Sequence, residues 1–114
     1  MAARLPSQLG TIDISEGVIA KIAGVNATEC FGVLGLAASD GWSDLLKKDS
    51  VDKGVRVQAM EDAKVRIEIS LVVQYGVSIK AVAETVINNI RYHVENMTGL
   101  TVADINVILR GIRV

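Results

Sequence analysis

The pattern of apolar and polar side chains changes period several times along the chain, and each change predicts a boundary between elements. Residues 10–14 alternate polar and apolar side chains, as a short strand does. Ser15 can cap a following helix, whose apolar residues at helical spacing continue to about Ala27. The segment Cys30–Ala38 is apolar or glycine throughout, which predicts a strand that is covered on both faces within the fold or is covered at an interface.

A β-hairpin is predicted after the middle of the chain. Residues 55–60 and residues 64–74 both alternate apolar and polar side chains, and residues 61–63 separate them as a turn. Alternation of this length predicts strands with one face in the core and the other face in solvent.

A long helix and a final strand follow this hairpin. Ser78 can cap the helix, and Gly99 can end it because glycine adopts the left-handed conformation needed there. The apolar stripe of this helix is Ile79, Val82, Ala83, Val86, Ile87, Ile90, Val94 and Met97. Residues 104–114 return to strand patterning. A strand, a helix and a strand in this order predict a right-handed parallel crossover.

Together these elements predict an α/β fold, a two-layer sandwich with a mixed sheet. The predicted element order is β-α-β-(short α)-β-β-α-β. The short helix belongs to an irregular connector, where Ser43 can cap a helix that extends to Lys48. We expect residues 1–9 to be a flexible N-terminus and residues 10–114 to form a single domain.

Composition narrows the classes of function. Half of the 114 residues are apolar and 22% are charged, which excludes a disordered chain and predicts one compact domain. The formal net charge of −1 leaves no broad basic surface for nucleic acid. The N-terminus has no apolar signal segment, and no apolar run approaches the about 20 residues that span a membrane. We therefore expect a cytoplasmic protein without direct membrane insertion.

Candidate reactive groups are few. One cysteine and one histidine, Cys30 and His93, are too few ligands for a zinc site and form the one conceivable nucleophile pair. We interpret them as a packed thiol and a histidine at the edge of the helix stripe. The carboxylates of Asp13 and Glu16 are explained by the start of the first helix. We predict no catalytic residue, no metal and no cofactor, and hence no enzyme.

One glycine pattern suggests a nucleotide-binding loop. Gly32 and Gly35 match the spacing of the GxxG loop of KH domains, which clamps a nucleotide backbone. The residues between them are apolar and no lysine or arginine lies nearby, so we interpret the match as chance.

The irregular connector carries a candidate partner contact, formed by Trp42, Leu45 and Leu46. A lone tryptophan in a connector either folds back onto the core or anchors a binding partner, and both interpretations stay open. The apolar segment Cys30–Ala38 and any uncovered sheet edge are further candidate contact surfaces.

Several blocks of the sequence, taken in order, resemble the alkaline-shock-protein family of bacterial envelope-stress-response proteins. The blocks are residues 10–23 (GTIDISEGVIAKIA), 29–33 (ECFGV), 53–57 (KGVRV), 75–79 (YGVSI) and 94–100 (VENMTGL) leading to 104–107 (DINV). The resemblance extends over nearly the whole chain, and the ordered set is far more specific than any one block.

The resemblance implies a cytoplasmic, non-enzymatic protein of Gram-positive or related bacteria. Some members of that family lie beneath the membrane, held by a membrane-anchored partner, and others are linked to fatty-acid or acetyl-CoA metabolism. The family pattern contains no catalytic residues. This chain lacks the long polar tails of the envelope-bound members, which favours a small housekeeping paralogue.

Two hypotheses of function follow. The first is a non-enzymatic scaffold or adaptor that acts through self-association and protein partners, which are a second copy or a membrane-anchored protein but not nucleic acid. Such a partner would place the protein at the inner face of the membrane. The alternative is a regulatory subunit that binds a small acyl or fatty metabolite in an apolar cleft between helix and sheet.

Overall fold

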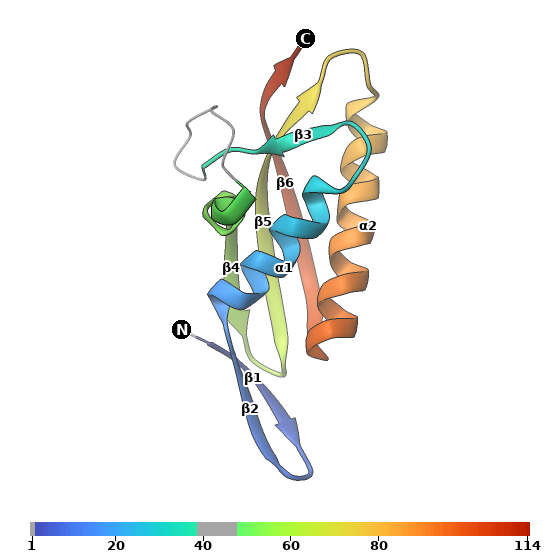
Figure 1. Ribbon diagram of the computed structural model, residues 1–114. Coiled ribbons are helices and arrows are strands. Elements are labelled where there is room, and N and C mark those ends of the chain that lie inside the picture. Colours follow the sequence, from blue (N-terminus) through green and yellow to red (C-terminus); the bar gives the residue numbers. More distant parts are fainter. Residues whose placement is uncertain (1, 39–47) are drawn as a thin grey trace.

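A mixed sheet forms the centre of the computed structural model, which describes residues 2–38 and 48–114 (Figure 1). Its central strand is β5 (Lys64–Gln74). On one side β5 pairs antiparallel with β4 (Val55–Met60) and, nearer its C-terminal end, with β3 (Val33–Leu36). On the other side it pairs parallel with β6 (Thr101–Arg113). The predicted α/β class, mixed sheet and parallel crossover are thus confirmed.

Both helices lie on one face of this sheet (Figure 1). The first, α1 (Glu16–Thr28), begins where the Ser15 hydroxyl accepts a hydrogen bond from the Val18 N–H at 3.2 Å. The second, α2 (Ile79–Thr98), is capped in the same way by Ser78 and ends at Gly99, whose φ is +80°. These three positions confirm the predicted caps, because side-chain hydroxyls and a left-handed glycine satisfy the free backbone groups at helix ends.

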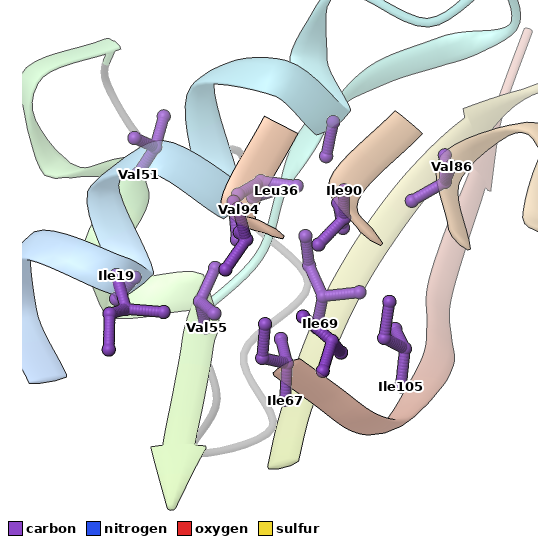
Figure 2. Close-up of a cluster of buried hydrophobic side chains, with 14 of the residues drawn as sticks. Ile19, Leu36, Val51, Val55, Ile67, Ile69, Val86, Ile90, Val94 and Ile105 are labelled. Atoms are coloured by element: carbon purple, nitrogen blue, oxygen red, sulfur yellow. The ribbon is translucent and has the colours of Figure 1, made fainter. Parts of the chain in front are cut away.

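The core lies between the helices and the sheet. Figure 2 shows Ile19 of α1 and Ile90 of α2 directed toward Ile67 and Ile69 of β5, and all four side chains are fully buried. Removing each such side chain from water contributes about 1.5–3 kcal/mol to folding. The period-two pattern of β5 and the 3.6-residue pattern of α2 therefore converge on a single apolar layer.

The stripe predicted for α2 is only partly buried. Val82, Val86, Ile90 and Val94 are buried, whereas Ile79 and Met97 are exposed. These two lie in the first and last turns of α2, where the helix extends beyond the buried cluster. Period alone predicts which face of a helix is apolar, but it does not predict how much of that face the sheet covers.

The strand predicted for Cys30–Ala38 is wrong at its start. Cys30 lies in a turn after α1, where its N–H donates to the Ala27 carbonyl at 3.1 Å. Gly32 then takes a φ of +86°, and a Cβ there would lie 2.8 Å from a Val82 methyl carbon. The chain can therefore enter β3 only at Val33, after glycine has made the reversal.

The solvent face predicted for the hairpin exists along only half of β5. Lys64 and Arg66 are exposed, but Ser70 and Val72 on the same face are buried. The Ser70 hydroxyl lies 3.4 Å from the Arg110 Nε, so this buried polar group is satisfied by β6.

The connector ends in a 3-10 helix, η1 (Lys48–Gly54). Val51 of η1 is buried against α1, and a Cβ built on Gly24 would lie 3.0 Å from Val51. Gly24, which weakens the interior of α1 on propensity alone, thus allows η1 to approach the helix closely. The short helix predicted from Ser43 falls mainly outside the described residues.

An N-terminal strand, β1 (Ala2–Ser7), was not predicted. It pairs antiparallel with β2 (Gly10–Ser15), and this hairpin projects from one end of the molecule (Figure 1). We call the β1–β2 hairpin the arm. Ala3 is buried near the base of the arm, and Leu5, which is opposite Ile12 farther along the arm, is partly buried against the core. The flexibility expected of residues 1–9 concerns motion and stays a prediction.

Candidate interaction surfaces

The cysteine and the histidine are separated by Asn89 of α2. The Asn89 Nδ2 donates to the Asn26 carbonyl at 2.8 Å and lies 3.6 Å from the Cys30 Sγ. The Asn89 backbone oxygen, in turn, lies 2.9 Å from the Nδ1 of His93. No contact joins the sulfur to the imidazole among the described residues. The structure therefore does not bring the predicted nucleophile pair into direct contact.

The surroundings of Cys30 also keep its thiol protonated. Burial raises the pKa of the Cys30 thiol, the hydrogen bond from Asn89 opposes this shift, and the charge of Glu29 adds to it. A thiol is a nucleophile only as the thiolate, and a raised pKa reduces the thiolate fraction at neutral pH. Cys30 is therefore a packing residue between α1 and α2, as its apolar setting indicated.

The two carboxylates near the first helix have separate partners. Asp13 pairs across the arm with Arg4, with 3.2 Å between Nε and Oδ1. Glu16 lies in the first turn of α1, as predicted, and its Oε2 also accepts a hydrogen bond from the Ala59 N–H at 3.0 Å. This link between α1 and β4 gave no signal in the sequence, because the two residues are 43 positions apart.

The GxxG match does not form a nucleotide-binding loop. Gly32 makes the turn before β3, and Gly35 lies within that strand, paired with Val72 of β5. The residues between the glycines are therefore strand residues of a sheet.

Trp42, Leu45 and Leu46 lie outside the described residues. Their role as a partner contact stays a prediction, as does the choice between an inward and an outward tryptophan.

The end of the sheet opposite the arm exposes large apolar side chains. Phe31 is 82% exposed and Tyr75 is 68% exposed, and Leu34 and Ile112 are also exposed. Backbone hydrogen bonds hold these segments side by side: the Gln74 N–H donates to the Gly32 carbonyl, and the Tyr75 N–H donates to the Arg113 carbonyl. We call Phe31, Leu34, Tyr75 and Ile112 the apolar end.

Part of the segment Cys30–Ala38 is exposed, and whether it forms the predicted contact surface stays a prediction. The exposed part is Phe31 and Leu34, whereas Cys30, Leu36 and Ala37 are buried. Exposed large apolar side chains on segments that lie side by side favour a protein contact. Sequence pattern could not separate these two groups, because both are apolar at every position.

Surface hollows among the described residues lie away from the interface of helices and sheet. One, of about 400 Å³, is lined by Arg56, Val57, Gln58, Arg66 and Glu68 on β4 and β5. Another, of about 610 Å³, lies between the arm and residues 60–63. A third, of about 330 Å³, lies over polar residues and Tyr92 on α2. An acyl-binding cleft would instead need an opening among the core residues of Figure 2.

Within residues 2–38 and 48–114, neither helix has the length together with the apolar character that a membrane crossing needs.

These features define a small two-layer α/β protein that exposes large apolar side chains at the apolar end. A family model matches residues 4–114, and its description is the alkaline shock protein 23 family, with cell envelope-related function. The chain belongs to this family, which confirms the resemblance found in the sequence blocks.

Individual relatives support this assignment. The chain is 36% identical to the uncharacterised protein YloU of Bacillus subtilis, over all of this chain and 98% of YloU. It is 33% identical to the uncharacterised protein Spy1614 of Streptococcus pyogenes serotype M6, over all of this chain and 97% of that protein. It is 37% identical to the uncharacterised B. subtilis protein YqhY, over 94% of this chain and 80% of YqhY. No solved structure matches the chain.

Proposed function

We propose that this protein is a non-enzymatic scaffold or adaptor in a cell envelope-related process, and that it acts through self-association and protein partners. The apolar end carries the proposal, because its exposed side chains come from three segments that the fold holds side by side. The family description, which names a cell envelope-related function, is compatible with such a role.

The size of the apolar end limits how it can act. Covering its four partly exposed side chains contributes on the order of 5 kcal/mol, from about 1.5–3 kcal/mol for each complete burial. Association costs an estimated 4–15 kcal/mol in lost freedom of motion. The apolar end alone therefore supports only a weak contact, and a stable complex needs a second surface or several copies acting together.

The partners that we propose are a second copy of the chain and a membrane-anchored protein. A partner of the second kind would hold this protein at the inner face of the membrane, although the described helices do not cross a bilayer. The alternative of an acyl-binding regulatory subunit gains no support from the described hollows, which lie on the surface and have charged or polar residues in their linings.

Light scattering coupled to size exclusion tests the self-association that we propose. We expect the wild-type mass to rise above the monomer mass of 12.2 kDa as concentration increases. The double variant Phe31→Ser and Tyr75→Ser should shift this rise to at least tenfold higher concentration, because it removes most of the exposed area of the apolar end.

The matched control is Tyr92→Ser on α2, since Tyr92 is also an exposed tyrosine but lies outside the apolar end. It should self-associate as the wild type does. A wild-type protein that stays monomeric at millimolar concentration, or a control that loses association equally, would contradict the proposal.

A further inference from the structure

The outer edge of β4 is partly closed by the chain itself. β4 is the last strand on its side of β5 over residues 64–69, and forms the left edge of the sheet in Figure 1. The Ala59 N–H points outward from this edge and donates a hydrogen bond to the Glu16 carboxylate, with 3.0 Å between the Ala59 nitrogen and the Glu16 Oε2. Before β4 the chain forms η1, and Val55 is buried. Both ends of this edge are therefore occupied.

Between these ends, Val57 is open. In an antiparallel pair, backbone groups of alternate residues point to the same side of the strand. Since the Ala59 N–H points away from β5, the N–H and C=O of Val57, two residues earlier, also point away from β5. No hydrogen bond from the described ranges 2–38 and 48–114 reaches these two groups. An added strand could satisfy both at once.

The side chains beside Val57 specify the charge of such a strand. Arg56 and Gln58 flank Val57 on the face away from the helices, and both are exposed. Arg66, the next cation on this face, lies 3.9 Å from Asp104. No ion pair reaches Arg56 within the described part of the chain, although Glu68 is opposite it in the β4–β5 register.

An incoming strand would meet these groups in a fixed alternation. Its residue opposite Val57 directs a side chain toward the helix layer, and the two neighbouring residues direct theirs beside Arg56 and Gln58. Glu68 of β5 is opposite Arg56 on one side. A carboxylate of the incoming strand beside Arg56 would lie on its other side and place the arginine between two negative charges. The preferred sequence therefore alternates acidic and apolar residues.

We propose that the edge of β4 at Val57 is a docking site for an extended segment of a partner protein in which acidic and apolar residues alternate. This inference rests on the adaptor function proposed above and specifies one of its partners. Charge favours this occupant over a second copy. Antiparallel pairing of two β4 strands about Val57 would place Arg56 opposite Gln58 and bring the two Arg56 side chains diagonally near each other, without an added carboxylate.

An NMR titration tests the site directly. The probe is a capped eight-residue peptide of alternating Glu and Val, added to the ¹⁵N-labelled full chain, and its charge control replaces every Glu by Lys. We expect the largest shifts and slowed hydrogen exchange at the Val57 amide, at least fivefold tighter binding of the Glu peptide, and weaker binding as salt increases.

Two variants separate charge from backbone pairing. Arg56→Gln should weaken binding of the Glu peptide at least fivefold, whereas Arg91→Gln, an exposed arginine on α2, should leave it unchanged. A Glu-Val peptide N-methylated at the residues facing the edge should not bind, because it lacks the donors that pair with the Val57 carbonyl. This peptide tests the backbone without any change in the protein.

Three results would overturn the proposal: an unperturbed Val57 amide at millimolar peptide, equal affinity for the Glu and Lys peptides, or a Val57 amide already protected in a dimer of the free protein. Failure here is distinguishable from failure of the self-association proposal. Arg56→Gln should leave the light-scattering mass unchanged, and the Phe31 and Tyr75 variant should still bind the Glu peptide.

Discussion

Two antiparallel hairpins, the β1–β2 arm and the β4–β5 hairpin, are built by the same backbone pairing but differ in what covers them. Each pairs six residues with six without a bulge. In the β4–β5 hairpin, Ile67 and Ile69 are completely buried under the helices. In the arm, Ile12 is 48% exposed and Leu9, at the tip, is 99% exposed. A two-stranded hairpin is marginal alone, so the arm depends on Ala3 and Leu5, which pack against the core.

The largest difference between the two hairpins should appear on truncation of their isoleucines. Ile69→Ala leaves a cavity in the core and should lower the free energy of unfolding by about 2–5 kcal/mol. Ile12→Ala in the arm should cost less than about 1 kcal/mol, because the side chain is half in solvent. Urea unfolding followed by circular dichroism measures both. Equal losses would show that the arm belongs to the same core.

The rate at which a cysteine reacts with a thiol reagent should be low in the core near α1 and α2 and high at the tip of the arm. Cys30 is buried and its pKa is raised, so its reaction with a disulfide reagent at about pH 8 should be at least about a hundredfold slower than in urea. Leu9→Cys in a Cys30→Ser background should react at the rate of the unfolded chain.

The raised pKa of Cys30 also predicts how the stability of the fold changes with pH. The folded thiol holds its proton more tightly than the unfolded thiol, so its contribution is complete below the ordinary thiol pKa and declines as pH rises above it. Cys30→Ser should remove this decline in urea unfolding measured at alkaline pH. Rapid labelling of Cys30 in the native protein would contradict the slow reaction predicted above, and a decline in stability that persists in Cys30→Ser would contradict this prediction.

Two left-handed glycines test how firmly Leu5 of the arm is held against the end of α2. Gly99 and Gly76 both have positive φ, but a Cβ on Gly99 would lie 3.1 Å from the Leu5 side chain, whereas a Cβ on Gly76 would meet nothing within 4 Å. Gly76→Ala should cost about 1–2 kcal/mol from backbone conformation alone. Gly99→Ala should cost more, by an amount that Leu5→Ala reduces in a double-mutant cycle of unfolding free energies. Equal losses of unfolding free energy for the two variants would show that the Leu5 side chain moves away from the added Cβ without a measurable cost.

The smallest effect is expected for the ion pair on the arm. Arg4 and Asp13 are both largely exposed, with side-chain exposures of 75% and 57%. Exposed pairs of this kind contribute about 0.2–1 kcal/mol and are screened by salt. Arg4→Ala should therefore change the unfolding free energy by less than about 0.5 kcal/mol at physiological salt. A larger loss of unfolding free energy in the same urea assay would show that the arm contributes more to the stability of the whole fold than its exposure indicates.

Local chemistry explains which elements were predictable. Ser15, Ser78 and Gly99 act within one turn of their own helix, so their roles are visible in sequence. The turn at residues 61–63 is bounded by two alternating runs and was placed correctly. β1 was missed because residues 2–7 lack regular alternation and contain Pro6. Its strand conformation comes from pairing with β2.

The candidate surfaces were predictable only in part. An apolar contact within Cys30–Ala38 was predicted, but the exposure of Phe31 depends on the turn that Gly32 makes after α1. The open stretch of the β4 edge at Val57 ends at Ala59, because Glu16 of α1 accepts the hydrogen bond of the outward-pointing Ala59 N–H. Contacts between residues so far apart in sequence leave no periodic signal along the chain.

The sequence by itself determined the alternation of strand and helix, the helix caps, the hairpin turn and the family. These depend on interactions within a few residues, or on blocks of sequence shared with relatives. The tertiary structure decided which apolar residues are covered, where the arm attaches and which part of the β4 edge is open. The physical reason is that the burial of a side chain, and the pairing of a backbone group at a strand edge, depend on which segment packs against it. That segment comes from a distant part of the chain.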